Sequence, residues 1–64
     1  MNVDVMAERV RAEFEEMPGM TLTLPQASRL FGLEDHVCRT IVERLVGTAY
    51  LRQTRTGAFT RAMR

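Results

Sequence analysis

The stretch Thr23-Leu-Pro-Gln-Ala-Ser-Arg-Leu-Phe-Gly-Leu-Glu-Asp-His-Val-Cys-Arg-Thr-Ile-Val-Glu-Arg-Leu-Val46 decides the fold. Its first part predicts a helix over residues 24–31. Thr23 and Gln26 have the spacing of a capping box, in which each side chain bonds the backbone N–H of the other residue. Pro25 lies in the first turn, where its missing N–H removes no helical hydrogen bond. Gly32 suits the left-handed backbone that ends many helices.

The second part of the stretch predicts a longer helix over residues 35–46. Apolar residues recur there at i, i+1, i+4, i+5, i+8 and i+9, which is one face of an α-helix and of no other regular structure. They are Val37, Cys38, Ile41, Val42, Leu45 and Val46. A helix, a short turn containing glycine and a second helix form the helix-turn-helix pattern. We expect Cys38 to be a buried, inert thiol, because an unpaired cysteine on an apolar face behaves as a small hydrophobe.

Weaker patterns lie on both sides of this stretch. An apolar stripe among charged residues predicts an amphipathic helix over residues 3–17, with Asn2 as its N-cap, and Pro18-Gly19 ends it. Residues 20–23 alternate apolar and polar side chains and predict a stub strand.

The C-terminal part predicts a β-hairpin over residues 50–62. Leu51 and Phe59 both face the core only if the strands are joined by a three-residue loop, 55–57, with Gly57 left-handed. The predicted core is Val10, Phe14, Leu22, Ala27, Leu30, Leu33, Val37, Ile41, Val42, Leu45, Leu51 and Phe59.

The predicted fold class is therefore α+β, a single domain over residues 1–64 in the order α-β-α-α-β-β. With Leu22 paired to the hairpin, the strands make a three-stranded antiparallel sheet beside three helices. This order, the turn at Leu33 and the junction Gly47-Thr-Ala-Tyr-Leu51 resemble the winged helix-turn-helix domains of bacterial transcription regulators. The resemblance covers about residues 4–62 and implies a recognition helix at 35–46 and a wing at 50–62.

Composition excludes several classes of protein. A chain of 64 residues with 45% apolar residues and one Cys has a small hydrophobic core and no disulfide framework. Its first residues have neither the basic region nor the apolar run of a secretory signal, and no stretch is long enough to cross a membrane. We therefore expect a cytoplasmic protein without a membrane partner.

Enzymatic activity is not expected. The chain has one His, one Cys, one Ser, no Lys and no glycine-rich phosphate loop. His36 and Cys38 lie two residues apart and point in different directions on a helix, and no second His or Cys completes a zinc site. We expect no catalytic residue, no metal and no cofactor.

Charge is unevenly distributed along the chain. Residues 1–36 carry seven acidic and three basic side chains, whereas residues 37–64 carry one acidic and six basic side chains. Such asymmetry is one indication that the basic half faces a nucleic acid.

The favoured function is DNA binding by a transcriptional regulator, with double-stranded DNA as partner. The expected DNA-binding residues are Gln26, Ser28, Arg29, His36, Arg39, Thr40, Arg44, Arg52, Thr54, Arg55 and Thr56. Those on the recognition helix face bases in the major groove, and those of the first motif helix and the wing face phosphates or the minor groove. Arg61 and Arg64 extend the same basic edge.

A protein-interaction or assembly module without DNA binding is the alternative. The net charge is only +1, and Glu34, Asp35 and Glu43 lie where phosphates would approach. In this alternative the acidic first helix is the partner surface, and it is a homodimer face if Phe14 or Met17 is exposed.

Overall fold

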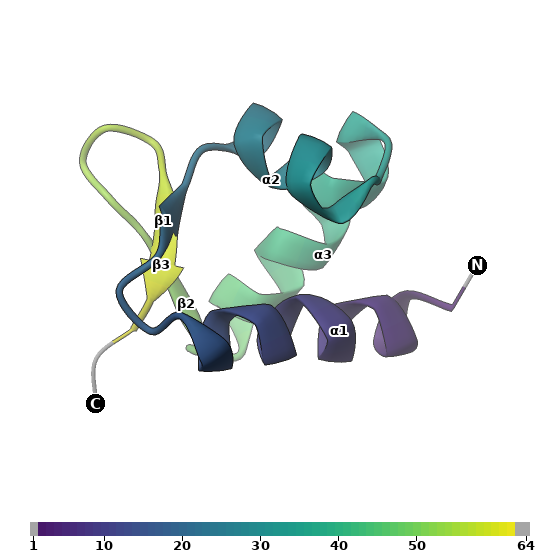
Figure 1. Cartoon of the computed structure of the whole chain (residues 1–64), viewed down its shortest axis with the longest axis horizontal. Coiled ribbons are helices and arrows are strands. Elements are labelled where there is room, and N and C mark those ends of the chain that lie inside the picture. The colour runs from purple at the N-terminus through teal and green to yellow at the C-terminus, as the bar shows by residue number, and fades with distance from the viewer. Residues whose placement is uncertain (1, 63–64) are drawn as a thin grey trace.

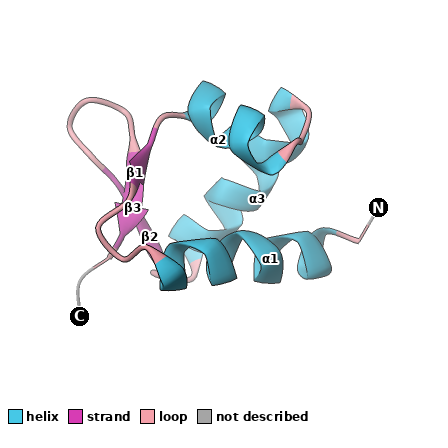
Figure 2. Cartoon of the chain, in the orientation of Figure 1, coloured by secondary structure: helices cyan, strands magenta, loops and turns pink. Residues whose placement is uncertain are grey.

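The computed structural model describes residues 2–62. Three helices and a small antiparallel sheet follow in the predicted α-β-α-α-β-β order. The elements are α1 (Val3–Glu16), β1 (Thr21–Leu22), α2 (Leu24–Phe31), α3 (Asp35–Gly47), β2 (Leu51–Gln53) and β3 (Phe59–Arg61). Helix α3 crosses between α1 and α2 and contacts both, and the sheet closes one end of the molecule (Figures 1 and 2). No helix in this part of the chain is long and apolar enough to span a bilayer.

Local hydrogen bonds fix the starts of the first two helices as predicted. The Asn2 side chain accepts from the backbone N–H groups of Asp4 and Val5, which have no partner inside α1. Both bonds of the capping box are present at α2: Gln26 N–H donates to Thr23 Oγ1 at 3.3 Å, and Thr23 N–H donates to Gln26 Oε1 at 2.9 Å.

Two helices end on a left-handed residue, and only one of these residues is glycine. Gly32 follows α2 with φ +67°. After α3 the left-handed residue is Ala49, with φ +66°. Ala49 N–H donates to Val46 C=O and Tyr50 N–H donates to Leu45 C=O, both at 2.9 Å, which is the Schellman pattern. Alanine therefore occupies a backbone position that favours glycine.

The sheet has the strand order β1-β3-β2, and both pairs are antiparallel. Gln53 pairs with Phe59 and Leu51 with Arg61, so Leu51 and Phe59 share the face that packs on the helices. Thr54 N–H donates to Ala58 C=O, which leaves residues 55–57 as the loop, with Gly57 at φ +88°. The predicted three-residue loop and its left-handed glycine are confirmed.

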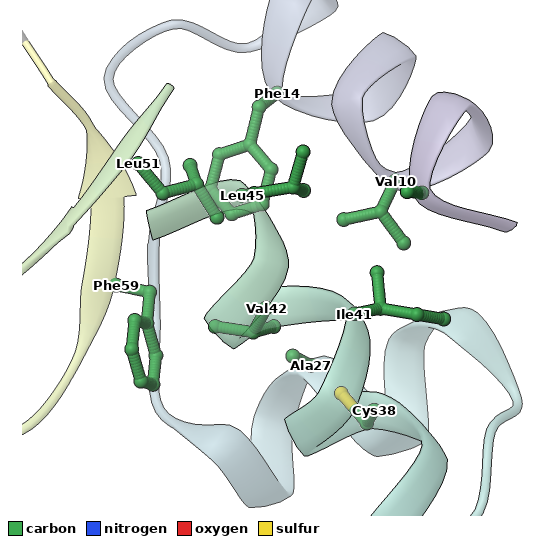
Figure 3. Packing of buried hydrophobic residues seen from close by; sticks show 10 residues of the cluster. Val10, Phe14, Ala27, Cys38, Ile41, Val42, Leu45, Leu51 and Phe59 are labelled. Carbon is green, nitrogen blue, oxygen red and sulfur yellow. The ribbon is translucent and has the colours of Figure 1, made fainter. Parts of the chain in front are cut away.

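The core gathers around α3 (Figure 3). Its buried residues are Ala7, Val10, Phe14, Ala27, Cys38, Ile41, Val42, Leu45, Leu51 and Phe59. Three other predicted core residues, Leu22, Leu33 and Val37, are partly buried against this cluster. Cys38 is buried, as predicted. Burial, together with the charge of the nearby Asp35, raises the pKa of its thiol.

The prediction that Leu30 is a core residue is wrong. Its side chain is 56% exposed, whereas Phe31 packs against the core with its ring centroid 6.5 Å from that of Phe14. Successive residues of an α-helix point about 100° apart. With Ala27 buried against α3, Phe31 four residues later shares its face and Leu30 turns toward solvent.

Candidate nucleic-acid interface

Helix α3, the predicted recognition helix, exposes a strip of polar side chains opposite its buried face. His36, Arg39, Thr40 and Glu43 are all exposed, as expected from the apolar stripe. Arg39 and Glu43 lie on the side of the strip nearest the β2–β3 hairpin, since both share a groove with Gln53 of β2. The strip therefore adjoins the hairpin along one side.

That groove has a volume of about 230 Å³ and lies between α3, the hairpin and the start of α2. It is lined by Leu24, Arg39, Glu43, Val46, Gln53 and Phe59. Arg39, Glu43 and Val46 are spaced i, i+4 and i+7, so they form one stripe along α3. The groove therefore combines the charged side chains of Arg39 and Glu43 and the amide of Gln53 with apolar lining residues.

Arg44, another predicted DNA contact, points to the other side of α3. Its guanidinium is 2.7 Å from the carboxylate of Asp4 on α1, and both residues line a second groove with Ala7 and Glu8. Both partners are largely exposed, so the pair adds little to stability. The pair matters for the charge of the surface, because Asp4 neutralises Arg44, which was predicted to bind DNA.

The start of α3 carries side chains that interact locally. His36 Nδ1 is 3.5 Å from Glu34 Oε1, and Asp35 lies in the first turn, where a negative charge suits the helix dipole. Glu34 makes no side-chain cap hydrogen bond. Thr40 Oγ1 donates to His36 C=O at 2.9 Å, so its hydroxyl proton is already used. In this conformation Thr40 presents a hydrogen-bond acceptor to the solvent.

Two of the three predicted phosphate contacts on α2 have roles inside the fold. Ser28 is half-buried, and its hydroxyl donates to Leu33 C=O at 2.5 Å across the turn between α2 and α3. Gln26 uses its carbonyl oxygen in the capping box. Arg29, in the last turn of α2, is exposed.

Two cations of the hairpin, Arg52 and Arg55, lie on its outer face and at its tip. Arg52 pairs with Thr60 in the register, which places both on the face away from the core residue Leu51. Arg55 and Thr56 are exposed in the loop, which projects beyond the sheet (Figure 1). Thr54 is half-buried and structural: its Oγ1 accepts from Ala58 N–H at 3.1 Å and lies 3.1 Å from Thr56 Oγ1.

A polar cluster that no sequence pattern indicates is centred on Tyr50. Its hydroxyl donates to Glu15 Oε2 at 2.6 Å and lies 3.3 Å from Arg11 C=O, and the Arg11 guanidinium stacks 4.7 Å from its ring centroid. Arg61 lies 5.5 Å from the same ring and 3.9 Å from Glu15. Arg61 therefore faces the end of α1, and Arg64 lies outside the described residues.

This cluster shifts two pKa values. The hydrogen bond from Tyr50, followed by the charge of Arg61, lowers the pKa of Glu15. Burial, followed by the Glu15 carboxylate, raises the pKa of Tyr50. The negative charge of Glu15 opposes the helix dipole at the end of α1. Its hydrogen bond with Tyr50 nevertheless ties that end to the residue preceding β2.

No protein-family model, curated protein or solved structure matches this chain. Its function is therefore inferred from the positions and charges of its own side chains. Among residues 2–62, no three His, Cys, Asp or Glu side chains lie close enough together to hold a metal ion. The arginines with no ion-pair partner in this range are Arg9 and Arg11 on α1, Arg29 on α2, Arg39 on α3, and Arg52 and Arg55 on the hairpin.

Proposed function

We propose that this protein is a winged helix-turn-helix DNA-binding domain of a cytoplasmic transcriptional regulator. Helix α3 enters the major groove, and the β2–β3 hairpin is the wing that contacts the backbone. The topology supports this proposal, since α2, a glycine turn and α3 precede a hairpin whose loop projects from the sheet.

One observation carries the proposal: the fold divides the five arginines of residues 37–62 into two groups. Arg44 and Arg61 pair with Asp4 and Glu15 of α1, on surfaces outside the α3–hairpin groove. Arg39, Arg52 and Arg55 make no such pair within residues 2–62. Phosphate contacts need cations that remain available to the ligand, and these three lie on the elements proposed to face DNA.

So few cations predict weak binding with a measurable dependence on salt. Each phosphate neutralised contributes about −0.9 to the slope of log K against log salt. Phosphate contacts from Arg52 and Arg55 of the hairpin give a slope of about −2, and a dissociation constant near the non-specific range of roughly 10⁻⁴ to 10⁻⁶ M.

Fluorescence anisotropy with a labelled mixed-sequence duplex at two salt concentrations tests the proposal. Arg39→Ala and Arg55→Ala should each weaken binding, and Arg55→Ala should also reduce the salt slope by about 1 because it removes a phosphate contact. Arg9→Ala, an equal change of charge at an exposed position of α1, is the matched control and should bind like wild type. Equal losses in all three variants, or no binding at low salt, would contradict the proposal.

The interaction-module alternative keeps one observation in its favour. Met17, just beyond α1, is 52% exposed, whereas Phe14 is 1% exposed and is not available to a partner. A homodimer through α1 would bury Met17. Light scattering of wild type and Met17→Glu tests this alternative: a dimer that dissociates in the variant supports it, and a monomer in both argues against it.

A further inference from the structure

The exposed strip of α3 carries one cation and one anion that the fold does not use. Arg39 and Glu43 are both exposed, and neither forms an ion pair within residues 2–62. The other charged groups of the helix have local partners or roles, because Arg44 is held by Asp4 and Asp35 lies in the first turn.

Arg39 and Glu43 act from the same side of the helix. They are spaced i, i+4 and line the same groove. A rise of about 1.5 Å per residue separates them by about 6 Å along the helix axis. Successive bases of a DNA strand are about 3.4 Å apart, so the two side chains reach base pairs no more than about two steps apart.

Their hydrogen-bonding groups are complementary. A guanidinium only donates, and it fits the O6 and N7 acceptors of guanine in the major groove. A carboxylate only accepts, and it fits the N4 amino group of cytosine but is repelled by the acceptors of guanine and thymine. A carboxylate at the C-terminal end of a DNA-facing strip thus disfavours some bases as well as favouring others.

We propose that Arg39 and Glu43 determine sequence specificity, with Arg39 binding a guanine and Glu43 a cytosine within two base-pair steps of it. This inference rests on the proposed DNA binding. It gives Glu43 a role in place of the purely repulsive one that its charge suggests.

Selection from a random-sequence duplex library, followed by sequencing, tests the pair. Wild type should enrich sites containing this guanine and cytosine. Glu43→Gln should lose the cytosine and favour adenine there by about tenfold, because an amide bonds both N6 and N7 of adenine. Glu8→Gln removes the same charge from an exposed position of α1 and should select the wild-type site.

Two results would overturn the inference while leaving DNA binding intact. One is an identical selected site for wild type and Glu43→Gln. The other is a uniform gain in affinity for all sequences in both glutamine variants, which indicates general repulsion only. Absence of binding to any duplex would overturn the inference together with the proposed function. Thermal melting, with Glu43→Ala as a second variant, establishes that any change is not due to unfolding.

Discussion

Exchanging the residue types at positions 47 and 49 should stabilise the protein. Gly47 is the last residue of α3 and has no positive φ, whereas Ala49 has φ +66°. Glycine thus occupies a helical position and alanine a left-handed one, which is the reverse of their preferences.

The magnitude follows from these two conformations. A left-handed backbone costs an L-residue about 1–2 kcal/mol, and the greater freedom of unfolded glycine offsets about 0.5–1 kcal/mol of the gain from removing the side chain. Ala49→Gly should therefore stabilise by about 0.5–1 kcal/mol. A Cβ on Gly47 meets no atom within 4 Å. Gly47→Ala should add up to about 0.5–1 kcal/mol, with the lower end expected at a helix terminus.

Differential scanning calorimetry of both single variants and the double variant measures the effect. About 1 kcal/mol corresponds to a Tm increase of roughly 4–8 °C for a domain of this size. Gly32→Ala is the matched control, because Gly32 has φ +67° and open space around a Cβ. Its Tm should fall, since only the backbone conformation opposes the change. A lower Tm for Ala49→Gly, or an unchanged Tm for Gly32→Ala, would refute the reasoning.

Two further predictions concern the core and the Tyr50 cluster. Ile41→Ala should lower the free energy of unfolding by about 2–5 kcal/mol, because the side chain is fully buried. Leu30→Ala, at an exposed position, should change it by about 0.5 kcal/mol or less. Chemical denaturation of both variants measures the difference, and equal effects would contradict the assignment of Ile41 to the core. Folding lowers the pKa of Glu15. The ionised Glu15 carboxylate therefore stabilises the folded state at pH values above its ordinary pKa of 4.5, and this stabilisation is lost as the pH falls through the lowered pKa of the folded state. Tyr50→Phe removes the hydrogen bond that is the main cause of this shift, so the stability of the variant should decline less on acidification than that of wild type. Equal declines in the free energy of unfolding with pH would argue against the hydrogen bond.

Sequence reasoning succeeded where neighbours in the chain determine the structure. The Thr23 capping box, the Gly32 helix end and the Gly57 loop each depend on a few consecutive residues. The hairpin register followed from one requirement, that Leu51 and Phe59 share a face. These features are local, so an unaided sequence contains the information that specifies them.

Sequence reasoning failed where tertiary packing determines which of two adjacent side chains is buried. Leu30 and Phe31 are both apolar, and only the direction from which α3 approaches α2 makes Phe31 the inward residue. The left-handed Ala49 was also not expected, because alanine has no preference for that backbone. Its position is imposed by the two Schellman hydrogen bonds and by the route of the chain into β2.

The candidate site was predicted as a set of exposed residues but not as a surface. Arg44 bonds Asp4, forty residues earlier in the chain, and Arg61 faces Glu15, and neither contact has a sequence signature. Such pairs form between charged side chains that a helix pattern treats alike. They remove two arginines from the expected DNA surface, and the DNA-binding role of the remaining residues stays a prediction.

The most direct test of the central claim is a titration of the ¹⁵N-labelled protein with duplex DNA, followed by NMR of the backbone amides. We predict salt-sensitive shifts at the exposed strip of α3, including Arg39 and Glu43, and at Arg55 in the hairpin loop, with α1 unaffected. Shifts confined to α1, or none at low salt, would contradict the account and favour an interaction surface on the first helix.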